Sequence, residues 1–350
     1  MKKIYLGIIL LILIISAFYI TTQSFKPQSS VSQPSNISMV FTGDVMFGRG
    51  VESVLHSNQN VFGDLKPLFL QSDIVVINLE SPFTNSNDNY KMAIPLKANP
   101  DFAHVLKDNN VNVVSLANNH IMDYGPSGLQ DTLAALDKYN IKHIGAGENL
   151  DKAVEPAYFD IDNRKIAILN YFDKSTFKGF GEKELLQASN NESGSAPADW
   201  NVVKKSIDDA KNKSDIVVVT FHYGNEYSTS PNNYQTDLSR KCIDEGADLV
   251  IGTHPHVPQS IENYKGKLIF YSLGNCVFDQ SNPATKDSMV VQLQVINGSA
   301  QVTVLPIHIT GSIPRYMDNK SANYFLQSIK AESNTNMNIE DGKGKIDLKI

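Results

Sequence analysis

Two histidines, His254 and His256, stand one residue apart in the stretch VIGTHPHVPQ (250–259), directly after an apolar run. On an extended segment, side chains two residues apart point the same way, so both imidazoles can face one cavity. This spacing is found among metal ligands, but a histidine-rich turn would show it too. The meaning of the pair therefore depends on which other ligand-type residues accompany it.

Polar and ionisable side chains stand at the ends of several other apolar runs. These runs have the length and composition of buried strands, and they cover residues 37–44, 73–80, 111–120, 165–171, 215–224, 247–256 and 267–275. In open α/β sheets, ligands bind beyond the carboxyl ends of the strands, so the ends of these runs mark the expected site. The side chains there are Asp44, Glu80, Asn119, His120, His222, Glu226, His254 and His256.

Each of these side chains taken alone has a structural explanation, such as a turn cap or a hydrogen-bonded histidine. Their recurrence at one strand end after another favours a shared site. Carboxylate, amide and imidazole groups form the mixed oxygen and nitrogen shell that suits Mn, Fe or Zn. A bridging carboxylate could hold two such ions about 3.5–4 Å apart, a pair suited to hydrolysis or transfer at a phosphoryl or acyl centre. We therefore predict a site for one or two divalent metal ions.

Helix-like segments alternate with the expected strands, which is the pattern of an α/β fold. They cover residues 100–109, 127–139, 199–213 and 235–245. Near the end of the chain, residues 288–297 and 300–310 alternate apolar and polar side chains around Asn297-Gly298, which predicts a β-hairpin. We therefore expect an α/β fold with mixed sheets.

The N-terminus predicts a membrane anchor. Lys2 and Lys3 precede an uncharged run, residues 4–20, which as a helix is just long enough to span a bilayer core. No small-residue cleavage site follows the run, which favours an uncleaved anchor. The two lysines keep the N-terminus in the cytoplasm, so the main domain is expected outside the cell.

The expected domain organisation follows from these patterns. A Ser-, Gln- and Pro-rich stretch after the anchor predicts a flexible linker, and the polar C-terminus predicts little regular structure beyond one short helix. The predicted parts are an anchor at 1–20, a linker at 21–36, the α/β domain at 37–315, and a helix with a polar tail at 316–350.

Composition limits the partners of the chain. The net charge of −6 and the absence of clustered Lys and Arg in the sequence exclude nucleic acid as an expected partner. An anionic substrate would also be repelled unless bound cations screened the site. The two cysteines, Cys242 and Cys276, do not form a disulfide framework and are expected to be buried free thiols, although an exported protein could pair them.

Six blocks of sequence carry a family resemblance. In order, they are FTGDVMFGRG (41–50), INLESPFT (77–84), SLANNHIMDYG (115–125), FHYGNEY (221–227), GTHPHVPQ (252–259) and YSLGNCVFDQ (271–280). This set, spread over residues 37–310, resembles the CapA-type proteins of poly-γ-glutamate capsule synthesis. That family is in turn similar to the calcineurin-like metallophosphoesterases. The resemblance implies an α/β/β/α sandwich with mixed sheets around a two-metal site. The membrane anchor predicted above would precede it as one transmembrane helix.

The resemblance also implies which residues bind metal. The positions that match the superfamily's ligand motifs are Asp44, Glu80, Asn119, His222, His254 and His256. His222, His254 and Asn119 would hold the better-bound ion. Glu80 would complete its shell and bridge to a second ion.

The chain departs from the superfamily pattern at two positions. The first motif there is D-x-H, but Met46 stands at the third position, and Glu80 replaces the bridging aspartate. A thioether is a poor ligand for hard divalent metals, so the ion nearest Asp44 and His256 is expected to bind more weakly.

Further residues receive roles by the same resemblance. His120 would donate a hydrogen bond to the developing oxyanion, and Asp123 would orient it. Arg49 can bind a substrate carboxylate or phosphate in bidentate fashion, although a surface arginine after a turn would look the same. Glu226 and Tyr227 are expected at the mouth of the site.

Three functions fit these observations. The first is a membrane-anchored, extracellular protein of poly-γ-glutamate synthesis and export, with a metal-dependent hydrolase-like site and other membrane components of the synthesis complex as partners. The second is a non-catalytic module that binds or guides the anionic polymer through a bound cation. The third is an exported metallophosphoesterase outside capsule biology. Of these, the wording of the NLE, NNH and HPH blocks favours the capsule family.

Overall fold

The computed structural model describes residues 36–57, 59–90, 93–175, 187–296 and 299–348, all within one compact unit, Ser35–Ile350. The predicted anchor lies outside the described residues, as does all of the predicted linker but its last residue. Among the described residues, no helix is long and apolar enough to cross a membrane.

The larger sheet contains parallel and antiparallel strands. Its main order is β17-β18-β15-β14-β1-β2-β3-β4, with β13 paired to β1 and β16 paired to β15. Strands β1 to β4 run parallel, whereas β14, β15 and β18 pair antiparallel. The strands are β1 (Asn36–Val45), β2 (Ile74–Leu79), β3 (Val113–Ser115), β4 (Lys142–Ile144), β13 (Asn275–Val277), β14 (Asp287–Ile296), β15 (Ser299–Thr310), β16 (Ile313–Tyr316), β17 (Asn338–Glu340) and β18 (Lys343–Leu348).

The smaller sheet has the order β11-β12-β10-β9-β7-β6. Its central strands β7, β9, β10 and β12 are parallel, and the two outer strands are antiparallel to their neighbours. The strands are β6 (Ala157–Ile161), β7 (Arg164–Phe172), β9 (Ile216–His222), β10 (Leu249–Thr253), β11 (Ile261–Tyr264) and β12 (Lys267–Phe270). A separate short pair joins β5 (Ala146–Gly147) to β8 (Gly194–Ser195).

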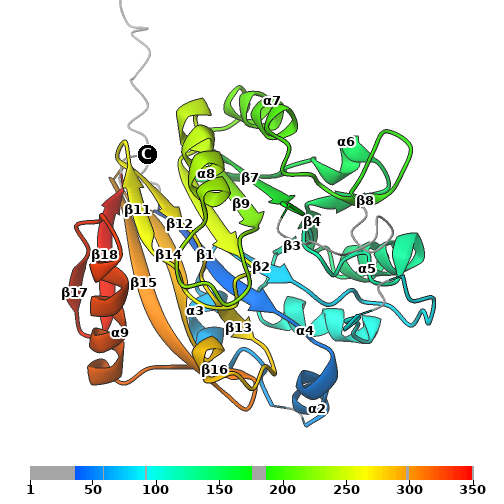
Figure 1. Cartoon of the computed structure of the whole chain (residues 1–350), viewed down its shortest axis with the longest axis horizontal. Coiled ribbons are helices and arrows are strands. Elements are labelled where there is room, and N and C mark those ends of the chain that lie inside the picture. The colour runs from blue at the N-terminus through cyan, green and yellow to red at the C-terminus, as the bar shows by residue number, and fades with distance from the viewer. Residues whose placement is uncertain (1–35, 58, 91–92, 176–186, 297–298, 349–350) are drawn as a thin grey trace, which may run out of the picture. The chain divides into compact units, whose positions relative to one another are not determined.

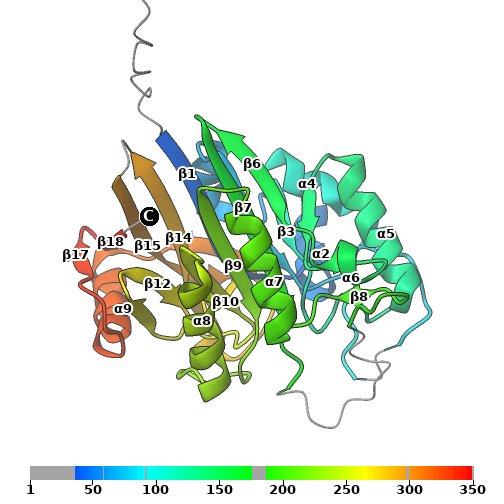
Figure 2. The same ribbon diagram turned by 90° about the horizontal axis from the view of Figure 1, so that it is seen from above.

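Helices α2 to α5 cover the outer face of the larger sheet and α7 and α8 that of the smaller sheet (Figure 1), whereas α9 packs its apolar side into the layer between the sheets. Figure 2 shows α7 and α8 on the opposite side of the sheets from α2 and α4. The helices are α2 (Arg49–His56), α3 (Lys66–Leu70), α4 (Ala103–Asp108), α5 (Gly125–Lys138), α6 (Leu150–Ala153), α7 (Trp200–Lys211), α8 (Asn233–Glu245) and α9 (Asn319–Ala331). Short 3₁₀ turns span Gly63–Leu65, Pro100–Phe102 and Pro283–Thr285.

Alternating side chains divide the core into three apolar layers. On β1, Phe41 packs between the two sheets, whereas Val40 packs between the larger sheet and the helices α2 to α5. On β9, Val218 points into the layer between the sheets, and Val219 points toward α7 and α8. The order is therefore helix, sheet, sheet, helix. The mixed α/β fold with mixed sheets that the sequence predicts is confirmed.

Each predicted strand segment overlaps an observed strand, and each predicted helical segment overlaps an observed helix. Strands β14 and β15 pair antiparallel as the predicted hairpin requires, while its turn, Asn297-Gly298, lies outside the described residues. Cys242 and Cys276 are buried and free, as expected.

The prediction of a polar C-terminal tail is wrong. After α9, strands β17 and β18 form a hairpin around Asp341 and Gly342, and β18 pairs with β15 to extend the larger sheet. Both turn residues have positive φ angles, 50° and 71°, as a two-residue type I′ turn requires. Ile346 and Leu348 point into the layer between the sheets, which explains why this polar segment is ordered.

Two glycines in the quoted blocks are required by close contacts between backbones. A Cβ atom at Gly43 would lie 1.8 Å from the carbonyl oxygen of Gly274, and one at Gly252 would lie 2.1 Å from that of Tyr271. The next residue after Gly43, Asp44, donates its backbone N–H to the same Gly274 oxygen at 3.0 Å. Gly43 therefore lets β13 approach β1 at the point where Asp44 is placed.

We expect Gly43→Ala to destabilise the protein by about 3 kcal/mol or more, because the clash is with backbone that cannot rotate away. The free energy of unfolding from urea denaturation measures this. Gly311→Ala is the control: nothing lies within 4 Å of a Cβ there, so only its positive φ of 58° is strained, at a cost of about 1–2 kcal/mol. Equal losses in the two variants would contradict the crowding at Gly43.

Candidate metal centre

Strand ends from both sheets place the predicted ligands in one buried region. Asp44 lies near the end of β1, Glu80 directly follows β2, and His222 ends β9. Parallel pairing aligns Asp44 with Asn78 on β2 and His222 with Thr253 on β10. The remaining predicted ligands, Asn119, His254 and His256, lie in the loops after β3 and β10, and all six are buried.

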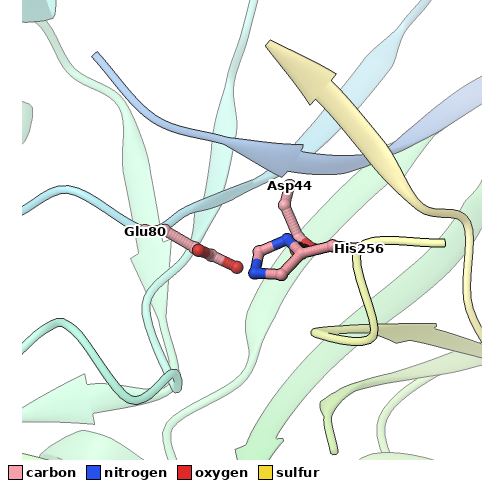
Figure 3. Close-up of side chains that lie close together, drawn as sticks. All are labelled: Asp44, Glu80 and His256. Carbon is pink, nitrogen blue, oxygen red and sulfur yellow. Dashed lines mark ion pairs between the residues drawn. The ribbon is translucent and has the colours of Figure 1, made fainter. Parts of the chain in front are cut away.

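Asp44, Glu80 and His256 form the tightest group of ligand atoms. One atom from each lies within 4.8 Å of the others, and Nδ1 of His256 is 3.3 Å from Oδ2 of Asp44. Figure 3 shows the second ring nitrogen of His256 directed toward the carboxylate of Glu80. Two carboxylates and one imidazole are thus brought together without contact with solvent.

The electrostatics of this group favour a bound cation. Burial, together with the nearby carboxylate of Asp44, raises the pKa of Glu80 well above its ordinary value. Oε2 of Glu80 is buried and has no hydrogen-bond partner within the described part of the chain. Burial opposes the charge of His256, but Glu80 and Asp44 outweigh it and raise its pKa to about 9. A divalent cation would neutralise both carboxylates and satisfy the orphaned oxygen.

A second convergence lies around His222. Its Nε2 atom is 2.8 Å from Oδ1 of Asn119, 3.0 Å from Nδ1 of His254 and 3.8 Å from Oε1 of Glu80. These are the four residues that the sequence assigns to the better-bound ion. Glu80 contacts both groups, which is the position expected of a bridging carboxylate.

Neighbouring hydrogen bonds orient His222. The Thr253 hydroxyl donates to the backbone oxygen of Phe221 at 3.1 Å, so its lone pair accepts from Nδ1–H of His222 at 3.2 Å. The amide nitrogen of Asn78 also lies 3.2 Å from that Nδ1, but its two hydrogens are directed to Asp44 at 2.8 Å and Glu80 at 3.4 Å. Nε2 of His222 therefore carries the lone pair, as a metal ligand requires.

His256 is oriented in the same way by Asn275. The amide nitrogen of Asn275 donates to Gln280 at 3.0 Å and to the backbone oxygen of Thr285 at 3.3 Å. Its Oδ1 atom must then accept the Nδ1–H of His256, at 2.8 Å. Nε2 of His256 is thereby turned toward the cluster, so the imidazoles of His222 and His256 are both set to bind metal through Nε2.

Sequence reasoning missed Asn78 and Asn118. Asn78 contacts Asp44, Glu80 and His222, and its Oδ1 accepts from Asn118 at 3.3 Å. Asn118 also donates to the backbone oxygen of Leu79 at 2.8 Å and accepts the backbone N–H of His120 at 3.0 Å. The signal for Asn78 was its position two residues before Glu80.

His120 and Asp123 form a buried pair. Nδ1 of His120 lies 2.8 Å from Oδ2 of Asp123, which also accepts the backbone N–H of Leu96 at 2.6 Å. Asp123 is fully buried, and His120 is 8% exposed. A carboxylate that accepts from Nδ1–H leaves Nε2 as the atom through which His120 exchanges protons.

The backbone around His-Pro-His is strained. His254 has a φ of 99° and His256 a φ of 60°, values in the left-handed region that side-chain-bearing residues rarely adopt. The backbone N–H of His254 donates to Oδ2 of Asp44 at 3.2 Å, and this contact helps to hold the turn. Strain of this kind gathers at functional sites because the surrounding structure must impose it.

Met46 supplies no ligand atom to the cluster. Its side chain is fully buried in the apolar layer between the larger sheet and the helices, and its sulfur accepts the backbone N–H of Gly48 at 3.0 Å. The Asp44 group therefore has one ligand fewer than the two-metal pattern described above.

Arg49, Glu226 and Tyr227 are exposed residues close to this group of candidate ligands. Nε of Arg49 donates to Asp279 at 3.3 Å, its Nη2 forms an ion pair with the same carboxylate, and its guanidinium lies over the Phe278 ring. The rings of Phe278 and Tyr227 lie 5.0 Å and 6.1 Å from that of His256. Glu226 is close enough for its charge to add to the raised pKa of Glu80.

Comparisons with known proteins are consistent with the quoted blocks. A family model described as bacterial capsule synthesis protein PGA_cap matches residues 38–280. The chain is 37% identical to the PGA biosynthesis protein CapA of Bacillus subtilis (strain 168), over 99% of this chain and 92% of that protein. It is 34% identical to the capsule biosynthesis protein CapA of Bacillus anthracis, over 89% of this chain and 77% of that protein.

Solved structures offer only a distant likeness. A structure from Staphylococcus aureus has a TM-score of 0.48 and 16% identity, over 74% of this chain and 51% of that one. This chain thus spans about half of that structure. A likeness at this level carries no functional conclusion.

We expect Glu80→Gln to abolish metal binding, because it removes the carboxylate that both groups of ligands share. Elemental analysis after dialysis against Mn²⁺ measures the bound metal. The matched control is Glu226→Gln, which changes a nearby exposed carboxylate and should retain the metal.

Unfolding of the variant would also cause a loss of metal. The raised pKa of Glu80 predicts instead that the metal-free variant is not destabilised. The pKa of Glu80 is raised in the folded chain, so at pH values above its ordinary pKa of 4.5 the ionisation of Glu80 opposes folding when no metal is bound. Glutamine cannot ionise, so the variant is free of this penalty. Metal-free Glu80→Gln should therefore melt no lower than the metal-free parent at pH 7. Undiminished Mn²⁺ in Glu80→Gln would contradict the assignment.

Proposed function

The chain belongs to the family of bacterial capsule synthesis proteins PGA_cap, and we propose that it serves poly-γ-glutamate synthesis as an extracellular, membrane-anchored protein with a metal-dependent hydrolase-type site. The family confirms the resemblance predicted from the six blocks. Its members include accessory proteins of poly-γ-glutamate capsule synthesis, which supports the polymer and the membrane components of its synthesis as partners.

One observation supports the metal site above all others. The shared carboxylate of Glu80 lies 3.8 Å from His222 and within 4.8 Å of Asp44 and His256, with one oxygen unsatisfied among the described residues. Buried carboxylates of this kind are stable only when a cation or a proton compensates them. Nitrogen and oxygen ligands of intermediate softness favour Mn, Fe or Zn.

The chain's own residues then divide the work. When bound, a divalent metal supplies Lewis-acid polarisation of a phosphoryl or acyl oxygen and activates water at neutral pH. Thr253 and Asn275 orient the rings of His222 and His256 so that Nε2 of each faces the proposed metal site. His120, held by Asp123 through Nδ1, is the residue we assign to protonate the leaving group or to stabilise the oxyanion through Nε2.

Arg49 and Tyr227 are the proposed contacts for substrate. Asp279 occupies Nε and Nη2 of Arg49, and a guanidinium has five N–H donors, so the others remain for a substrate carboxylate or phosphate. The side chain of Tyr227 is 48% exposed and is therefore accessible to a substrate. Its φ of 62° is a strained backbone value of the kind that gathers at functional sites. The negative charge of Glu226 would attract a metal ion toward the site.

We expect His222→Ala and His254→Ala each to lower turnover by about a hundredfold or more, because each removes a ligand from the fuller set. Residues 35–350, purified and loaded with Mn²⁺, would be assayed on a phosphodiester and on γ-linked glutamate oligomers. His308→Ala is the matched control, since His308 is exposed and, among the described residues, forms an ion pair only with Asp287. If the protein binds stoichiometric metal but turns over neither substrate class, the hydrolase proposal is contradicted and the binding module remains.

The proposed topology has its own test. Because Lys2 and Lys3 favour a cytoplasmic N-terminus, protease added to intact cells should digest the domain of the full chain while a cytoplasmic marker survives. Immunoblotting against the C-terminus measures the loss. A domain that stays protected until the cells are lysed would contradict the outward placement.

A further inference from the structure

Asp279, two residues after the end of β13, holds the side chain of Arg49 in place. Nε of Arg49 donates to Oδ2 of Asp279 at 3.3 Å, and its Nη2 forms an ion pair with the other carboxylate oxygen. The same Oδ2 accepts the backbone N–H of Gly50 at 3.0 Å. Asp279 thus contacts both the guanidinium of Arg49 and the backbone directly after it.

The backbone around Arg49 is fitted to this contact. A Cβ atom at Gly50 would lie 3.1 Å from Oδ2 of Asp279, which is tighter than most Cβ contacts in proteins. Arg49 itself has a φ of 51°, in the left-handed region that side-chain-bearing residues rarely adopt. Glycine would adopt this conformation without strain, so an arginine here points to a role for its side chain.

Contact through Nε and Nη2 leaves one edge of the guanidinium open. The guanidinium is planar and has five N–H donors, and Asp279 occupies those on the Nε side. No described residue accepts a hydrogen bond from Nη1 of Arg49, and the side chain is 38% exposed. The remaining N–H groups of Nη1 and Nη2 form a second fork, which matches two oxygens of one carboxylate or phosphoryl group.

Phe278 links this arginine to the candidate metal centre. The guanidinium carbon of Arg49 lies 5.7 Å from the centre of the Phe278 ring, and the ring centre of His256 lies 5.0 Å from the same point. Burial raises the pKa of Tyr227, the charge of Glu80 adds to this, and the charge of Arg49 opposes it. The charges of Arg49 and Glu80 therefore both reach Tyr227, so the arginine lies close to the candidate ligands.

We propose that Asp279 is a positioning residue for substrate binding, which fixes the guanidinium of Arg49 so that its open fork receives an anionic group of the substrate. The inference rests on the proposed function, which makes Arg49 a substrate contact. Arg49 reaches the candidate ligand His256 through the Phe278 ring, so the group it binds lies apart from the reacting bond. Loss of this contact should therefore raise KM and leave kcat nearly unchanged.

A purely structural role for Asp279 is the alternative. Gly48, the N-cap of α2, has no side chain with which to cap the helix, and Asp279 accepts the N–H of Gly50 in the first turn. A carboxylate at a helix N-terminus is stabilising in its own right. Asp279→Asn separates the two roles, because its amide oxygen can still accept from Gly50 whereas its NH₂ group cannot accept from Arg49.

Steady-state kinetics of the full chain, in detergent micelles and loaded with Mn²⁺, test the positioning role on whichever substrate class is turned over. We expect Asp279→Asn to raise KM about fivefold to tenfold, with kcat within about twofold of the parent. Arg49→Ala should raise KM further. Asp279→Asn/Arg49→Ala should match Arg49→Ala, because Asp279 acts only through the arginine. An unchanged KM in Asp279→Asn, or additive losses in the double variant, would overturn the proposal.

Asp64→Asn is the matched control. Asp64 accepts from Nη1 of Arg315 at 2.9 Å and from the backbone N–H of Tyr316 at 3.1 Å, so it makes the same pair of contacts as Asp279. The variant should keep the KM of the parent. A rise in KM as large as that of Asp279→Asn would mean a general structural effect and would also overturn the proposal.

Binding measurements separate this proposal from the proposed function. Isothermal titration calorimetry with γ-linked triglutamate and with inorganic phosphate, as carboxylate and phosphoryl probes, needs no turnover. We expect Arg49→Ala and Asp279→Asn to weaken the binding of at least one probe, and the probe affected identifies the anion.

The outcomes differ for the two proposals. If no substrate is turned over but probe binding depends on Arg49 and Asp279, the hydrolase proposal fails and the positioning role stands. If turnover is present and Asp279→Asn changes neither KM nor probe binding, the positioning role fails and the proposed function stands. A parent that neither turns over substrate nor binds either probe contradicts both.

Discussion

The carboxylates of Asp44 and Glu80 are buried together where two neighbouring strands end, and the rest of the site compensates for their charge. One oxygen of each carboxylate lies within 4.8 Å of the other, and at that separation two negative charges repel by about 3 kcal/mol or more, even at an effective dielectric constant of 20. Asn78 offsets part of this by donating to both, and His256 does so by holding a proton up to a pKa of about 9. Gly43 makes the arrangement possible because it lets β13 approach beside Asp44.

Sequence reasoning could single out the candidate ligands because they break a strong pattern. Asp44, Glu80 and His222 each end or directly follow a run of buried apolar residues, where a polar side chain needs a reason. Asn78 stands inside such a run, and Thr253 is the last residue of another. Only the pairing between strands shows which residues they contact. Their roles depend on contacts between residues far apart in the chain, which a single sequence does not encode in any periodic form.

The fold was predicted where apolar periodicity is strong and missed where it is weak. Strands β1, β2, β7, β9 and β10 are nearly continuous apolar runs, so their type and order could be read directly. Strand β18 carries only Ile346 and Leu348 as large apolar residues and is interrupted by Gly344. It is ordered because β15 offers it an edge, and the Asp341-Gly342 turn was the one local signal. Helices α2 and α3 are short, and the layer beneath them determines them more than their own sequence.

An acidic protein whose proposed partner is a polyanion needs positive charge at the point of contact, and a cation bound at the metal centre would supply it. At the metal centre, buried carboxylates and imidazoles would hold a cation in a site of low dielectric, so contacts there are strong and fixed in position.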